Sequence, residues 1–360
     1  DEQRRALEAL APDLLVAKRA ERPTGLPDLE GATEGRVVMR FAPGPSGPLH
    51  LGHARAAILN DEYCRRYKGR YILRLEDTDP ARVQPEAYGM IEEDMAWMGC
   101  KVHEVVVQST RFERYYEIAR RLLEIGKAYV CTDKPDDWRG LKDAKKPCAH
   151  RHLDPAVQLE AFDAMLGGGF GPEQAAVIGK SDLSHPNPAV RDFPLLRIED
   201  TPHPRTGTRY RVYPLMNFSV SVDDHDLTHV LRGKDHLNNT ERQRYLFGHL
   251  GWAMPHYIHY GRVSIEGLEL STSKMWAGIL RGDFAGWDDV RLGTIRALAR
   301  RGYRPESIRE YWVDSSVKEV DIVFSWKNLN AIDKKRADAE ACRLFFVGRP
   351  TAVDVEVPSD

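Results

Sequence analysis

The most constraining feature of this sequence is the segment at residues 40–53, which reads RFAPGPSGPLHLGH. It starts at the end of an apolar run typical of a β-strand, crosses a loop of prolines and glycines, and opens a helical pattern. Two histidines, His50 and His53, stand one turn apart at the start of that helix. Since a helix N-terminus presents unpaired N–H groups and a partial positive charge, the segment predicts a site for a nucleotide phosphate.

Strand and helix patterns alternate around this segment. Strands are predicted at residues 37–41, 71–75 and 105–107, and helices at 51–67, 85–98 and 111–125. Alternation of this kind indicates a parallel sheet with right-handed crossovers. A doubly wound sheet binds its ligand at the carboxyl ends of the strands, where the loop at 42–48 would lie. The sequence therefore predicts an α/β, Rossmann-like nucleotide-binding domain.

The chain divides into regions of different character. We expect an N-terminal helical extension at residues 1–35 and a nucleotide-binding domain in two halves, at 36–130 and 206–262. An inserted α+β domain at 131–205 would separate the halves. A loop with a helical region would follow at 263–320, and the start of a β unit at 321–360. The inserted region is rich in proline and glycine and has little clear periodicity. Further strands are predicted at 209–213, 228–232, 322–324 and 343–347, and further helices at 4–20 and 288–312.

Composition limits the class of protein. Lysines and arginines number 52 against 54 aspartates and glutamates, for a net charge of −2, so the chain is no generally basic nucleic-acid binder. The five cysteines are scattered and odd in number, which argues against a disulfide framework. No apolar run reaches membrane-spanning length, and the first residues form a charged helical pattern rather than a signal peptide. We expect a cytoplasmic protein.

The two histidines have three candidate roles. At the helix start they could donate to phosphoryl oxygens as negative charge grows during attack on an α-phosphate, while Gly52 lets a flat adenine lie against the helix. Histidines at this spacing could instead be a metal pair, and either could be a satisfied core histidine. The preceding strand and the loop favour the nucleotide site.

Several motifs resemble those of one enzyme family. The HLGH sequence at 50–53 resembles the HIGH signature of class I aminoacyl-tRNA synthetases, and LSTSK at 270–274 lies where their KMSKS loop is expected. Lys274 matches the second lysine of that loop and Ser273 its serine, whereas Ser271 and Met275 replace the first lysine and the final serine. The departure reduces the positive charge that the loop would supply.

Further motifs narrow the resemblance. RLEDTD at 74–79 closes the second strand, and YPLMN at 213–217 and RGKDH at 232–236 are expected in the second half of the sheet. Together with the two signatures they resemble the glutamyl- and glutaminyl-tRNA synthetases, and specifically the archaeal-type glutamyl enzymes, from about residue 36 onward. By this resemblance the inserted domain would bind the acceptor end of tRNA, the helical region would contact its stem, and the last residues would begin an anticodon-binding β-barrel.

The resemblance also implies site residues. Catalysis would fall to His50, His53 and Lys274. The ATP site would be lined by Gly44, Pro45, Ser46, His50, Gly52, His53, Ala54, Arg55, Gly233, Arg262, Val263, Thr272, Ser273 and Lys274. The amino-acid site would be lined by Arg40, Ala42, Glu76, Tyr213, Asn217 and Arg232. Gly44 departs from the polar residue expected there, so its side-chain role is lost.

Charge favours glutamate over glutamine as the substrate. Two guanidiniums, Arg40 and Arg232, would face the two carboxylates of glutamate, and each arginine–carboxylate pair is a strong and geometrically defined contact. Glutamine has one carboxylate, so one buried arginine would be left uncompensated. Glu76 would hold the α-ammonium group.

The expected reaction is that of a glutamyl-tRNA synthetase. ATP with Mg²⁺ would activate L-glutamate, and the terminal ribose of tRNA(Glu) would take the glutamyl group, on a chain expected to be a monomer. Three rivals stay open: a glutaminyl enzyme or one that also charges tRNA(Gln), a small-molecule nucleotidylyltransferase, and a non-catalytic tRNA-binding paralogue.

Cysteines and histidines flank a short loop in the inserted region. Cys131 and Asp133 are followed by Cys148 and His150, which gives the spacing of a zinc site. Related enzymes often have Cys-x-Cys where this chain has Asp133. Free cysteines beside a surface histidine pair, His150 and His152, are the alternative, and the sequence favours it.

Overall fold

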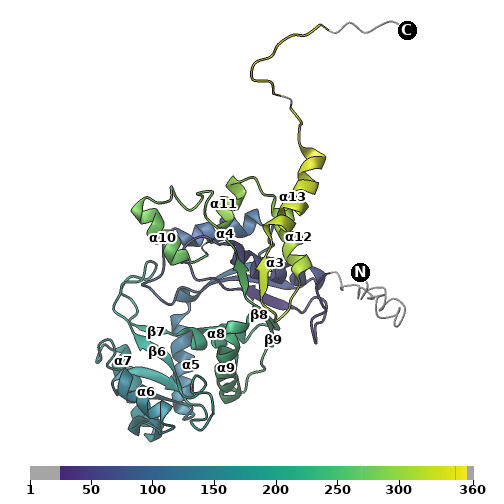
Figure 1. Cartoon of the computed structure of the whole chain (residues 1–360). Helices are drawn as coiled ribbons and strands as arrows, with labels where there is room; N and C mark the ends of the chain where they lie inside the picture. Colours follow the sequence, from purple (N-terminus) through teal and green to yellow (C-terminus); the bar gives the residue numbers. More distant parts are fainter. Residues whose placement is uncertain (1–24, 269, 345, 355–360) are drawn as a thin grey trace, which may run out of the picture.

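A parallel sheet and its crossover helices form the centre of the molecule. The computed structural model describes residues 25–268, 270–344 and 346–354 (Figure 1), so the helix expected at 4–20 lies outside the described residues. Three strands pair in parallel in the order β1-β2-β3: Val38–Phe41, Arg70–Leu75 and Glu104–Val107. Helices α3 (Leu51–Arg66) and α4 (Ala87–Trp97) connect them. The strands and helices predicted here are confirmed.

A second pair of parallel strands lies beside β1. Strands β8 (His229–Gly233) and β9 (His256–Tyr260) pair in parallel, with α8 (Met216–Asp224) and α9 (Leu237–Leu250) next to them in the chain. The N–H of Thr228, just before β8, donates to the carbonyl of Val38 in β1 at 3.1 Å. The carboxyl ends of β1 and β8 therefore open side by side, at the kind of position where doubly wound folds bind ligands.

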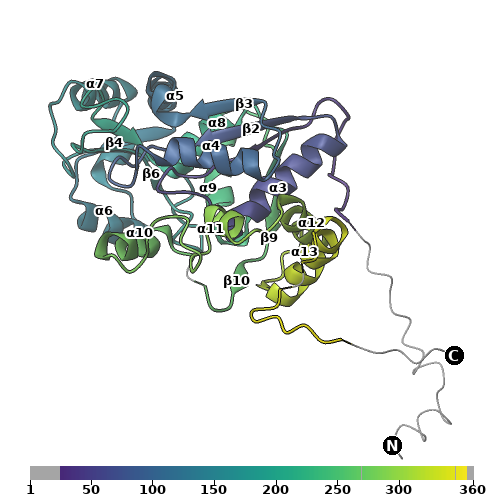
Figure 2. The ribbon, with the colours of Figure 1, turned by 90° about the horizontal axis from the view of Figure 1, so that it is seen from above.

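An antiparallel sheet occupies one side of this centre (Figure 2). Its strand order is β4-β5-β6-β7, with bounds Ala128–Cys131, Ala176–Gly179, Phe193–Ile198 and Val212–Pro214. The helical elements around it are α5, α6, η2 and α7, with bounds Phe112–Glu124, Pro135–Asp143, Ala149–His152 and Pro155–Leu166. Placing Tyr213 in the second half of the parallel sheet was wrong, because β7 pairs Tyr213 with Arg197 of β6.

The last part of the chain is mainly helical. Strands β10 (Val263–Ile265) and β11 (Ile322–Phe324) pair in parallel, which confirms the short strand expected at 322–324. The helices are α10, α11, α12 and α13, with bounds Thr272–Arg281, Ile295–Arg300, Pro305–Ser315 and Trp326–Glu340. The single helix expected at 288–312 is broken into α11 and α12 at Gly302, where φ is +86°. The described part of 343–347 forms no strand.

Two large apolar cores hold these parts together. One packs α3, α11, α12 and α13 against the β1-β2-β3 sheet, and the other fills the space between α5, α7, α8 and the antiparallel sheet. In the first core the ring of Trp312 is fully buried and meets Phe324 with a centroid distance of 5.6 Å. In the described part of the chain, every helix is too short or too polar to cross a bilayer.

Replacing Trp312 by alanine should lower the free energy of unfolding by about 3–5 kcal/mol, because a fully buried indole leaves a large cavity. Denaturant unfolding followed by circular dichroism measures this. Leu280→Ala is the control, since the Leu280 side chain is 68% exposed and its loss should change little. Equal effects of the two changes would contradict the core assignment.

Candidate active site

A cavity of about 290 Å³ opens at the carboxyl ends of β1 and β8. It is bounded by β1 and its following loop, the start of α3, the end of β2, α8, β8 and the end of β9. Eight residues expected at the nucleotide or amino-acid site line it: Arg40, Ala42, Gly44, Gly52, His53, Glu76, Arg232 and Gly233. Segments far apart in the sequence thus meet where the fold predicts a ligand.

The two histidines hold the first turn of α3 through each other. His50 is the N-cap residue, and its Nδ1 accepts from the N–H of His53 at 3.3 Å. In return the N–H of His50 donates to Nδ1 of His53 at 3.4 Å, and the two rings stack with centroids 3.6 Å apart. Because both Nδ1 atoms accept, each neutral ring carries its proton on Nε2. The Nε2–H of each ring is therefore left as a donor, and of the two residues His53 lines the cavity whereas His50 does not.

Both imidazoles are neutral near pH 7. Burial lowers the pKa of His50 to about 4, and burial together with the neighbouring His50 ring lowers the pKa of His53 as well. Neutral N–H groups beside a helix N-terminus can donate hydrogen bonds to an anion.

The segment that carries Lys274 lies against the loop at 42–53. A Cβ on Gly47 would come within 2.6 Å of the Thr272 methyl group and 3.0 Å of the Trp287 ring, and one on Gly52 would lie 3.7 Å from Leu270. Ser271 is the N-cap residue of α10, so Lys274 stands in its first turn with an exposed side chain. The fold thus brings together the two segments that the sequence paired.

A buried charge cluster forms the floor of the cavity. Asp224 accepts from Arg40 with both oxygens at 3.3 Å and from Arg74 at 2.7 Å, while Glu76 accepts from Arg74 at 2.9 Å. Burial alone would raise the pKa of Asp224, but the two guanidiniums outweigh it and hold that pKa below its usual value. Asp224 and Arg74 were not predicted.

Arg232 faces the same cavity without an acidic partner. It donates to Gln243 at 2.9 Å and to the hydroxyl of Thr240, and its guanidinium lies over the Tyr257 ring, 4.3 Å from the centroid. Among the described residues no carboxylate is within ion-pair distance of it. Burial lowers the pKa of Arg232 to about 10.

Some expected site residues do not line the cavity. Ala54 and Arg55 are fully buried, and the Arg55 guanidinium donates to the carbonyls of Gly261 and Ser316 at 2.9 and 3.1 Å. The expectation that the Arg55 side chain lines the ATP site is therefore wrong. It supports the site from behind, by tying α3 to the turns after β9 and α12.

Three more expected residues lie apart from the cavity lining. Tyr213 packs in the second core, 5.1 Å from the Phe112 ring. Asn217 stands in α8 beside the cavity-lining Met216, and its Oδ1 is buried with no hydrogen-bond partner among the described residues. Arg262 is exposed, and its N–H donates to Asp321 at 2.6 Å. The Tyr213 hydroxyl is likewise buried with no hydrogen-bond partner among the described residues, so both orphaned oxygens point to a missing ligand.

The remaining expected residues flank the site in two places. Pro45 and Ser46 lie in the loop after β1, where the Pro45 carbonyl accepts from Gln84 at 2.8 Å. Val263 begins β10, and Thr272 and Ser273 begin α10.

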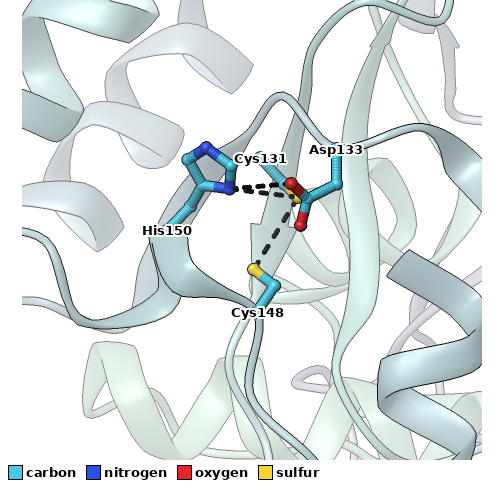
Figure 3. Close-up of side chains that lie close together, drawn as sticks. All are labelled: Cys131, Asp133, Cys148 and His150. Carbon is cyan, nitrogen blue, oxygen red and sulfur yellow. Dashed lines mark hydrogen bonds and ion pairs between the residues drawn. The ribbon is translucent and has the colours of Figure 1, made fainter. Parts of the chain in front are cut away.

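The possible zinc ligands converge on one point (Figure 3). The sulfurs of Cys131 and Cys148 are 3.7 Å apart, and Nδ1 of His150 lies 3.8 Å from Cys131 Sγ and 3.5 Å from an oxygen of Asp133. One ligand atom from each of the four residues lies within 4.8 Å of the others. The His152 side chain expected at the surface belongs to η2 and is not in this group.

The order of the elements, the adjacent histidine and lysine segments and the cavity at the strand ends agree with a class I synthetase domain. The family model for the catalytic domain of class I tRNA synthetases (E and Q) matches residues 36–339, and the chain belongs to this family.

Curated relatives narrow the resemblance further. The chain is 53% identical over 358 residues to a glutamate–tRNA ligase of Methanocaldococcus jannaschii, covering 99% of this chain and 64% of that protein. It is 53% identical over 361 residues to one of Methanospirillum hungatei, with the same shares covered. The resemblance to archaeal glutamyl enzymes is thereby confirmed, and the chain spans about 64% of the length of these relatives.

A solved structure shares the fold. A glutamate tRNA ligase from Elizabethkingia meningosepticum, in complex with its amino acid, superposes with a TM-score of 0.59 at 21% identity, covering 84% of this chain and 70% of that one.

Gly47→Ala should weaken ATP binding about tenfold, because an added methyl group overlaps Thr272 and Trp287 and forces the loop and α10 apart. Calorimetric titration with ATP measures the change. Gly89→Ala is the matched control, since nothing lies within 4 Å of a Cβ at that helical position. Unchanged ATP affinity in Gly47→Ala would show that the contact of Gly47 with Thr272 and Trp287 is not needed for ATP binding.

Proposed function

We propose that this chain carries the catalytic part of a glutamyl-tRNA synthetase. It would activate L-glutamate with ATP and transfer the glutamyl group to the terminal ribose of tRNA(Glu). The single observation that carries the choice of substrate is the charge balance of the cavity.

Around the cavity lie three guanidiniums, those of Arg40, Arg74 and Arg232, and two carboxylates, those of Asp224 and Glu76, which pair with Arg40 and Arg74. The cluster therefore has one positive charge in excess. Glutamate, with two carboxylates and one ammonium group, carries one net negative charge and neutralises it. Glutamine is net neutral and would leave a buried guanidinium uncompensated, which is unfavourable.

The geometry suggests which groups would meet the substrate. Arg232 is the guanidinium without an acidic partner, so it would take the side-chain carboxylate. Glu76 lines the cavity with its carboxylate and would hold the α-ammonium group. Asn217, with its unpaired buried oxygen, would accept from that ammonium group or from the substrate backbone.

The histidine segment would serve the chemical step. An α-carboxylate oxygen of glutamate forms a bond to the α-phosphorus of ATP, the bond from that phosphorus to the bridging oxygen breaks, and pyrophosphate leaves. The Nε2–H groups of His50 and His53 would donate to phosphoryl oxygens as charge grows, and Lys274 would face the leaving pyrophosphate. Mg²⁺ would accompany ATP, and positioning suffices without a covalent nucleophile.

The tRNA would meet the remaining parts of the chain. The antiparallel sheet with α6 and α7 would bind the acceptor end, and the helical region from α10 to α12 would contact the stem. The residues from 321 onward would begin the anticodon-binding part, and the chain would act as a monomer. The domain limits given from the sequence remain predictions.

We also propose that the four converging ligands bind Zn²⁺. Ligand atoms in a tetrahedron around zinc at about 2.0–2.3 Å lie roughly 3.3–3.8 Å apart, which fits the three measured separations. Nε2 of His150 lies 2.9 Å from the Thr132 hydroxyl oxygen, so it can donate there and leave Nδ1 for the metal. Hydrogen bonding from Cys131 and from His150 lowers the pKa of Cys148, while hydrogen bonding to Cys148 and burial raise the pKa of Cys131, so the pair favours one thiolate before a metal binds.

Arg232→Gln should raise the KM for glutamate about a hundredfold or more, because the substrate carboxylate would be left unpaired in a buried site. ATP–pyrophosphate exchange with glutamate or glutamine, with and without tRNA(Glu), measures it. Arg114→Gln is the control, since Arg114 pairs with Asp226 at the surface. Wild-type exchange that is as fast with glutamine as with glutamate would refute the assignment, and charging assays with tRNA(Glu) and tRNA(Gln) separate the remaining rivals.

The purified protein should contain about one zinc per chain by elemental analysis. Cys148→Ser should lose most of this zinc, because it removes one of the two thiolates. Cys342→Ser is the control, since Cys342 is exposed and far along the chain from the cluster. Zinc content that is absent, or the same in both variants, would remove the metal proposal.

A further inference from the structure

Asp94 is a buried acid beneath the histidine segment that the reaction outlined above does not use. It lies in the second half of α4 and is 3% exposed. Its side chain does not reach the cavity. A buried carboxylate is expensive unless its oxygens are satisfied, so its partners indicate what it is for.

One carboxylate oxygen of Asp94 holds the backbone just before His50. The N–H of Leu49 donates to Asp94 Oδ2 at 2.8 Å. The carbonyl of Leu49 accepts from the N–H of Ile295 at 2.8 Å, and the N–H of Leu51 donates to Gly293 at 2.9 Å. Both backbone polar groups of Leu49, the residue before the N-cap of α3, are therefore fixed from α4 and α11.

The other oxygen of Asp94 faces a cation from the second of those elements. Arg296 of α11 places its Nε 3.3 Å from Asp94 Oδ1. The same guanidinium donates to the Met90 carbonyl at 3.3 Å and pairs with Glu93. Asp94 thus stands where α4, the histidine segment and α11 meet.

We propose that Asp94 is a positioning residue for the two histidines, acting through the Leu49 peptide and through Arg296. We call the contacts of Asp94 with Leu49 and Arg296 the clamp. The expected effect of the clamp on the reaction rate rests on the proposed function, whereas the contacts themselves do not. Holding Leu49 fixes the direction in which the chain enters α3. That direction determines how the His50 and His53 rings stack and where their Nε2–H groups point.

The clamp has a pH dependence whose sign follows from burial. Burial raises the pKa of Asp94 to about 7, although the Leu49 N–H and Arg296 act to lower it, and Glu93 adds to the rise. Above this pH the carboxylate is charged and pairs with Arg296, and below it a proton removes that attraction. Because the folded protein binds this proton more tightly than the unfolded chain, the contribution of Asp94 to stability falls as pH rises from about 4 to about 7.

The test compares Asp94→Asn with the wild type in ATP–pyrophosphate exchange from pH 6 to 8.5. We expect wild-type kcat to fall on the acid side with a midpoint near pH 7. Asp94→Asn should give a flat profile, about tenfold below the wild type at pH 8, with the KM for glutamate unchanged. Its thermal stability at pH 8 should be no lower than that of the wild type, since the variant removes a buried charge. A residue needed only for folding would not give this combination.

Glu93→Gln is the matched control. Glu93 is the neighbouring acid on α4 and also pairs with Arg296, but it makes no hydrogen bond to Leu49. Its pH profile should follow that of the wild type. A profile equally flattened in Glu93→Gln would overturn the role given to Asp94.

A spectroscopic measurement tests the clamp without the reaction. In protein labelled with ¹⁵N-leucine, one amide proton should shift with a midpoint near pH 7, and this titration should vanish in Asp94→Asn. If no leucine amide titrates in this way, the proposal is wrong even when the enzyme is active. If the amide titrates while glutamate exchange is absent even with tRNA(Glu) added, the clamp stands and the proposed function fails.

Discussion

The bridge that Asp224 makes between Arg40 and Arg74 is the interaction on which the rest of the site depends. It joins the end of α8 to β1 and β2, three elements that lie far apart in the chain. Without this carboxylate, two guanidiniums would face each other in a buried space, which a protein does not tolerate. With it, the carboxyl ends of the strands can close around a cavity that keeps one positive charge in excess.

Much of this architecture follows from local sequence patterns. The strand, loop and helix at residues 38–66 could be predicted because apolar periodicity, glycine and proline act within a few residues of one another. The strands β5 and β6 could not be, since they are short segments in a region rich in proline and glycine whose pairing is set by distant partners. Tyr213 was placed in the wrong sheet for the same reason, since its strand β7 pairs with β6 of the antiparallel sheet.

A site residue could be predicted where a sequence motif specifies its residue type. It could not be predicted where its place depends on contacts between segments far apart in the chain. Arg40, Glu76 and Arg232 stand out because they are charged residues at the carboxyl ends of apolar strand patterns. Asp224 does not, because nothing near it in the sequence shows that it will lie under Arg40, 184 residues away. Arg55 shows the opposite error, since a residue next to a motif can point into the core and serve the structure.

The reciprocal cap of α3 has a consequence for how this site evolves and how it is studied. Most helices begin with a serine, threonine, aspartate or asparagine, and the chemistry then uses other groups. Here the two rings that would face the nucleotide also close the first turn of a 16-residue helix. Exchanging either ring therefore alters catalysis and frays the helix at once, so the loss of activity in such a variant measures both effects. A side chain that still caps but cannot donate from Nε2, such as asparagine at position 50, would separate them.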